Sequence, residues 1–169
     1  MTAQRILFRI ALLIVAAILQ VVVVNRIPLP GGQPDLLLLV VVGIAFASGA
    51  ERGALFGFCA GLLADFLPPA GHIAGREAFV YTVIGFGAGL FEDPEETSVL
   101  TTILVVAVGS AALVALYDGL GGLLGDARVT REDFLHSLLG TVVYDVVLAP
   151  FIVRPVSAFA RRLEPVGPR

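Results

Sequence analysis

The composition of this 169-residue chain indicates a membrane protein. Hydrophobic residues make up 57% of it, charged residues only 15%, and the mean hydropathy is +0.95. A soluble domain averages about 45–50% apolar and about 25% charged residues, so the lipid bilayer is the expected solvent. Eleven basic residues against fourteen acidic ones, with no basic stripe, exclude a nucleic-acid-binding protein. The single cysteine, Cys59, excludes a disulfide scaffold.

The apolar segments predict an all-α, polytopic membrane protein with about six transmembrane helices in a single domain, residues 1–169. The predicted spans, in chain order, are 6–24, 36–49, 52–67, 77–91, 94–117 and 134–153. The first resembles a secretory signal, but it has no small-residue cleavage site and further apolar segments follow, so a retained span is expected. Its nineteen residues cover about 28 Å, close to the roughly 30 Å thickness of the hydrocarbon layer.

The second and third predicted helices are short. Asp35 follows a loop rich in proline and glycine and stands where an N-cap belongs, directly before the apolar run Leu36–Leu39. The break between the two helices is expected at residues 48–52. Each helix covers only about 21–24 Å, so a re-entrant hairpin is the alternative to two full spans.

The last two predicted helices have marked starts. Asp93-Pro94 fits an N-cap followed by the first helical position, and this helix is expected to end near Tyr117, before the glycine-rich segment 119–125. Thr130 begins a sequence similar to a capping box, and the helix that follows is expected to end near Val153.

An even number of spans places both termini on one side of the membrane. On that side the predicted topology collects seven arginines, against four on the other. Because basic residues are enriched in cytoplasmic segments, both termini are expected in the cytoplasm.

The third predicted helix carries small residues at a spacing of four. Gly53, Gly57 and Gly61 share one face, and Asp65 continues it. Small residues let two helix backbones approach closely, which is how helices associate in lipid. Packing within the chain is the favoured interpretation, and a partner or ligand site is the alternative. Two glycines of the fourth predicted helix are expected to meet this stripe: Gly85 and Gly89.

A polar stripe runs down the sixth predicted helix. It comprises Ser137, Thr141, Asp145 and the small Ala149, with Tyr144 beside it. A charge near the middle of a span costs about 2.5–3.5 kcal/mol, so Asp145 is expected to face the bundle or water. The favoured interpretation is a hydrogen-bonded Asp145 that fixes helix packing, with Thr141 or a hydroxyl group of another span as its partner. A proton relay or ligand contact is the alternative.

The sequence holds no motif that points to catalysis. It has no nucleophile elbow, no phosphate-binding loop and no paired catalytic carboxylates on one helix face. Neither His72 nor His136 has further ligands at metal-binding spacing. We therefore expect no enzyme activity, no metal and no cofactor.

Four segments together resemble the family of rod shape-determining protein MreD. They are Pro34–Leu39, Gly53–Pro69, Tyr81–Leu90 and Tyr144–Phe151. The resemblance covers nearly the whole chain, in order and in size. No single segment is diagnostic, and the combination carries the resemblance.

The resemblance implies a non-enzymatic component of the cell-elongation machinery in the bacterial cytoplasmic (inner) membrane. MreC is the expected partner, with MreB and the peptidoglycan synthases as indirect ones and membrane lipid around the helices. The family is also similar in fold to the substrate-binding subunits of energy-coupling-factor transporters. This similarity supplies the alternative, a subunit that captures a vitamin-type small molecule. Few loop aromatics and no tryptophan are available to grip a vitamin ring.

Overall fold

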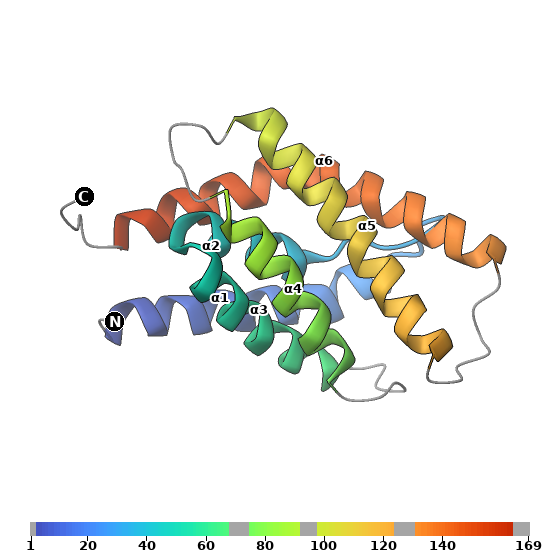
Figure 1. The fold of residues 1–169 in the computed structure, drawn as a ribbon, viewed down its shortest axis with the longest axis horizontal. Coiled ribbons are helices and arrows are strands. Elements are labelled where there is room, and N and C mark those ends of the chain that lie inside the picture. Colours follow the sequence, from blue (N-terminus) through green and yellow to red (C-terminus); the bar gives the residue numbers. More distant parts are fainter. Residues whose placement is uncertain (1–2, 68–74, 92–97, 124–130, 164–169) are drawn as a thin grey trace.

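The computed structural model describes residues 3–67, 75–91, 98–123 and 131–163, and these residues are helical or connecting, with no strand. The helices, in chain order, are α1 (Ala3–Val22), the short 3-10 helix η1 (Val24–Arg26), α2 (Leu36–Ser48), α3 (Ala50–Asp65), α4 (Arg76–Gly89), α5 (Val99–Leu123) and α6 (Arg131–Leu163). Figure 1 shows them as one bundle. The predicted all-α class is confirmed, and the fold is consistent with a polytopic membrane protein.

The helix α2 forms the core. Every residue from Leu37 to Ser48 is buried, and α2 contacts α1, α3, α4, α5 and α6. This helix has no charged residue on any face. A helix that is apolar all round is kept from water, by a protein core or by lipid.

A single residue joins α2 to α3. Gly49 adopts a φ of 82°, and its N–H donates to the carbonyl oxygen of Ala45 at 2.9 Å. Because only glycine adopts this left-handed region without strain, Gly49 places the break where the sequence predicted it. The predicted bounds of the first four helices lie within three residues of those observed.

The helix α5 departs from its predicted bounds at both ends. It begins at Val99, where the Ser98 hydroxyl accepts a hydrogen bond from the Thr101 N–H at 3.1 Å. The expected N-cap at Asp93-Pro94 lies outside the described residues. At the other end the expectation of a stop near Tyr117 is wrong, since α5 continues to Leu123. Glycine costs a helix only about 1 kcal/mol per residue, which disfavours the segment after Tyr117 without forbidding a helix there.

The helix α6 is longer than predicted. It continues ten residues past the expected end at Val153, through Pro155, to Leu163. A proline removes one backbone hydrogen bond and disturbs the preceding turn. Here the continuing helix buries Val153, Ser157 and Ala160 on one face, and that packing offsets the local cost.

Three of the described helices are long and apolar enough to cross a membrane. The segments are Ile6–Arg26, Val99–Leu116 and Phe134–Leu163, and α2 is a shorter apolar helix. The start of α1 and the end of α6 lie at the same end of the bundle (Figure 1), where the rings of Phe8 and Phe159 pack with centroids 5.0 Å apart. The number of crossings, six, stays a prediction.

Candidate functional site

The glycines of α3 lie directly on α4. A Cβ atom built on any of three α3 glycines would collide with the α4 backbone: Gly53, Gly57 and Gly61. In return, a Cβ on Gly85 would collide with the carbonyl oxygen of Gly53, and one on Gly89 would lie 2.5 Å from Cα of Ala50. The predicted meeting of the two glycine sets is therefore an internal contact, which leaves this face of α3 covered.

Asp65, which continues the glycine stripe, holds the start of α4. Its side chain is buried, and its carboxylate accepts hydrogen bonds from the N–H groups of Gly75 at 2.8 Å, Glu77 at 3.1 Å and Ala78 at 3.3 Å. The first N–H groups of a helix have no partner within the helix, and a carboxylate there also interacts favourably with the positive end of the helix dipole. Asp65 thus joins α3 to α4.

The carboxylate of Asp145 lies at the centre of a buried polar network. One oxygen accepts a hydrogen bond from the Asp35 N–H at 2.7 Å, and the other accepts one from the Ser110 hydroxyl at 2.6 Å. Asp145 itself is fully buried. The expected hydroxyl partner is therefore Ser110 of α5, and Thr141 of the same helix does not fill this place.

Asp35 connects this network to α2 and α4. One carboxylate oxygen accepts from the Leu38 N–H at 2.9 Å, which is the predicted N-cap of α2. The other accepts a hydrogen bond from the hydroxyl of Tyr81 in α4. We call Asp35, Tyr81, Ser110 and Asp145 the polar centre. It joins four helices at one point.

Gln20 of α1 holds the same segment from the other side. Its amide nitrogen donates to the Pro34 carbonyl at 3.0 Å, and its amide oxygen accepts from the Leu36 N–H at 2.9 Å. The sequence interpretation missed Gln20, Ser110 and Tyr81. The available signal was the presence of each polar group inside a long apolar run, where a hydrogen-bond partner is required.

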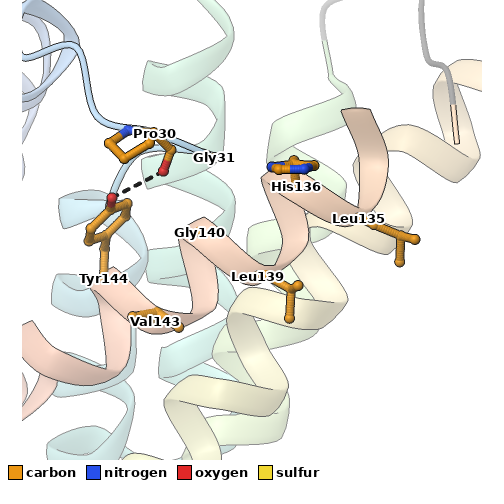
Figure 2. Close-up of a pocket in the computed structure, with 8 residues that line it drawn as sticks. All are labelled: Pro30, Gly31, Leu135, His136, Leu139, Gly140, Val143 and Tyr144. Atoms are coloured by element: carbon orange, nitrogen blue, oxygen red, sulfur yellow. Dashed lines mark hydrogen bonds between the residues drawn. The ribbon is translucent and has the colours of Figure 1, made fainter. Parts of the chain in front are cut away.

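The remaining predicted residues of α6 meet the loop before α2. The Tyr144 hydroxyl donates to the Pro30 carbonyl at 3.1 Å, as Figure 2 shows. A Cβ built on Gly32 would lie 2.9 Å from the Thr141 hydroxyl oxygen, so this loop lies against the helix. Thr141 and Tyr144 therefore occupy different surroundings from Asp145, although the three share one helix.

Two hollows lie beside these residues. A polar cavity of about 290 Å³ lies next to the polar centre. A wider groove of about 560 Å³ runs along the outside of α6 (Figure 2). Its lining residues are Pro30, Gly31, Leu135, His136, Leu139, Gly140, Val143 and Tyr144. Among the described residues, no three metal-binding side chains converge on one point, and His72 lies outside them.

A comparison with protein families matches residues 2–163 to rod shape-determining protein MreD. The chain belongs to the MreD family. It is therefore a rod shape-determining membrane protein, of a family of structural proteins that determine cell shape. Neither a curated protein nor a solved structure matches the chain. The likeness to energy-coupling-factor subunits accordingly stays a prediction.

The polar centre of this MreD-family protein lies where three of the four resembling segments meet. Asp35 belongs to the first of those segments, Tyr81 to the third and Asp145 to the fourth. Hydrogen bonds join these residues, although the bonded partners lie 46 and 110 positions apart in the sequence. The second segment, Gly53–Pro69, supports this arrangement because α3 fixes the position of α4.

Proposed function

We propose that this MreD-family protein is a non-enzymatic scaffold of the cell-elongation machinery and that it binds MreC within the bilayer. In this role it positions the extracytoplasmic part of MreC toward the peptidoglycan synthases and connects indirectly to MreB. The observation that carries the proposal is the outward face of α6.

That face is a continuous apolar stripe at a spacing of four residues. Its five large side chains are between 51% and 74% exposed: Leu135, Leu139, Val143, Val147 and Phe151. Side chains four apart lie on the same side of a helix, so the stripe forms a strip along which lipid or a second helix can pack. MreC is expected to offer one membrane helix, and one such strip is what a single helix needs.

The competing candidate, the glycine face of α3, is already occupied by α4. Close backbone approach is the main benefit of small residues in a membrane interface. Since the α3 glycines contact the backbone of α4, a partner helix would have to displace α4 to use them. The support for docking therefore shifts to α6.

Site-directed crosslinking tests this proposal. In a Cys59→Ala background, single cysteines at Leu139 and Val147 are labelled with a photoreactive maleimide in cells that also express MreC. The matched control is Val108→Cys, which is equally exposed (68%) but lies in the apolar groove between α4 and α5. Crosslinks to MreC from α6 and none from Val108→Cys are expected. Crosslinks from Val108→Cys alone would place the docking surface at the groove between α4 and α5. The absence of co-purification with MreC would overturn the proposed scaffold function.

One observation favours a second candidate function, the capture of a small molecule. The polar cavity beside the polar centre has room for a ligand. A capture subunit must bind its substrate with high affinity, whereas a scaffold does not have to bind a small molecule. Submicromolar binding of a vitamin-type ligand by the purified protein, without association with MreC, would favour this second function.

A further inference from the structure

The polar cavity lies between four helices and the loop before α2. Its lining residues are Gln20, Gln33, Pro34, Asp35, Glu77, Leu113, Val114, Ser137 and Thr141. Six of these nine side chains are polar. Its volume of about 290 Å³ is many times the roughly 30 Å³ that one water molecule occupies in the liquid. The cavity therefore has room for a small polar ligand.

The hydroxyl of Thr141 has no hydrogen-bond partner among the described residues, although the side chain is only 8% exposed. Threonines inside helices ordinarily donate to the carbonyl four residues earlier. Thr82 does so to Ala78 at 2.5 Å and Thr102 to Ser98 at 3.2 Å. Thr141 lines the cavity, and its hydroxyl oxygen is not one of the fully buried side-chain atoms that lack a partner, so the hydroxyl opens into the cavity and can bond to a ligand there.

The side chain of Glu77 lines the same cavity and has no hydrogen-bond donor among the described residues. It is half-buried. Asp35 differs, since its carboxylate is supplied by Tyr81 and by the Leu38 N–H. Glu77 is thus the carboxylate in this cavity that lacks a donor.

The charge around the cavity is negative. Asp35 and Glu77 line it, and Asp145 lies one hydrogen bond behind Asp35. None of the described residues that line the cavity is basic, and the positive charge that acts on Glu77 is that of its neighbour Arg76. Carboxylates removed from water require a positive charge, a proton or several hydrogen-bond donors. A ligand that matches the cavity carries positive charge together with N–H donors. Hard metal ions need six or more oxygen ligands, and no group of three candidate metal ligands occurs among the described residues.

We propose that this cavity binds an alkylammonium group, which donates hydrogen bonds to the Glu77 carboxylate and the Thr141 hydroxyl. The inference does not depend on the binding of MreC. Gln20 lies near the end of α1, Glu77 near the start of α4 and Thr141 in the first third of α6, so the cavity lies toward the end of the bundle away from Phe8 and Phe159. An ammonium group can reach it there from solution, as a free amine, or from the bilayer, as a phosphatidylethanolamine headgroup.

The first test measures binding of radiolabelled ethanolamine by the full-length protein in nanodiscs of phosphatidylglycerol, a lipid that carries no amine. Saturable binding is expected. Choline, which has the same charge but no N–H donor, should bind at least tenfold more weakly, because charge-assisted hydrogen bonds are lost. Absence of saturable ethanolamine binding, or equal affinity for choline, would overturn the proposal.

Substitutions locate the site. Glu77→Gln and Thr141→Val should each weaken ethanolamine binding by tenfold or more. Thr141→Ser, which keeps the hydroxyl, should bind ethanolamine as the original protein does. Glu51→Gln is the matched control, since Glu51 is an exposed glutamate on α3. Size-exclusion profiles check that each variant is folded. Unchanged affinity in both folded variants, Glu77→Gln and Thr141→Val, contradicts the assignment.

Lipid composition distinguishes the two sources of the ammonium group. The ethanolamine titration is repeated in nanodiscs that contain phosphatidylethanolamine and in nanodiscs that contain phosphatidylcholine. Competition by phosphatidylethanolamine alone identifies the headgroup as the ligand. Unchanged ethanolamine binding in both identifies a free amine, and either result supports the ammonium site.

Discussion

At the scale of single residues, the polar centre determines how strongly the start of α2 is fixed. Two of its hydrogen bonds join Asp35 to distant helices. The Asp35 N–H donates to the Asp145 carboxylate, and the Tyr81 hydroxyl donates to the Asp35 carboxylate. A buried donor or acceptor that loses its partner costs about 1–3 kcal/mol. The individual contributions can therefore be measured by removing one group at a time.

Asp145 is expected to act through hydrogen bonding. In Asp145→Asn the amide oxygen can still accept from the Asp35 N–H, and the amide nitrogen can donate to Ser110, whose hydroxyl also accepts. We expect the unfolding free energy to stay within about 1 kcal/mol of the original. In Asp145→Leu both bonds are lost, and a decrease of about 2–3 kcal/mol is expected. Denaturant unfolding in detergent measures both, and an equal loss in the two variants would contradict a hydrogen-bonding role.

Two tyrosines offer a matched comparison. Tyr81 is fully buried and donates to the Asp35 carboxylate, whereas the Tyr144 hydroxyl donates to Pro30 near the surface. Removal of the buried hydroxyl leaves a carboxylate short of a donor, while water can replace the exposed one. Tyr81→Phe should lower stability by about 1–2 kcal/mol and Tyr144→Phe by less than about 1 kcal/mol. The reverse order, measured by thermal unfolding, would show that the polar centre does not stabilise the fold.

At the scale of elements, the pair α3–α4 depends on the absence of side chains. Gly57 faces the carbonyl oxygen of Tyr81 so closely that a Cβ atom has no space. Gly87, on the same pair of helices, has nothing within 4 Å of a Cβ. The two glycines therefore test the contact separately from helix propensity.

The same substitution at both positions should have opposite effects. Gly57→Ala forces α3 and α4 apart and should lower the melting temperature and the folded yield. Gly87→Ala adds a methyl group in open space and gains up to about 1 kcal/mol of helix propensity. Fluorescence-detected size exclusion after heating measures both. If Gly57→Ala were as stable as Gly87→Ala, the close approach of the two helices would be wrong.

At the scale of the whole molecule, the start of α1 and the end of α6 share one end of the bundle. The rings of Phe8 and Phe159 pack against each other at this end. The loop before α2 lies near the opposite end of α1. An even number of crossings, with both termini in the cytoplasm, follows as the expected topology.

Impermeant thiol reagents test that topology in a Cys59→Ala background. Arg26→Cys and Arg162→Cys replace exposed side chains at opposite ends of the bundle. Arg26→Cys should react in intact cells, and Arg162→Cys only after the membrane is permeabilised. Labelling of Arg162→Cys alone in intact cells would show the opposite orientation, and labelling of both cysteines would require an odd number of crossings.

The sequence alone determined what short-range patterns can encode. Apolar runs predicted the helices, Asp35 predicted the cap of α2, and the segment around Gly49 predicted the break. Each signal depends on a few neighbouring residues, because caps, turns and helix periodicity are local properties of the backbone. The family followed from the order of such segments along the chain.

Only the tertiary structure decided which distant groups meet. The extension of α6 past Val153 depends on a face that packs on the core, and no local rule contains that packing. The bond between the Asp35 N–H and Asp145 spans 110 positions, and its existence depends on how α2 and α6 lie against each other. The open hydroxyl of Thr141 likewise results from the position of the loop and α4 around it. Hydrogen bonds between helices require three-dimensional proximity, which spacing along a single helix does not specify.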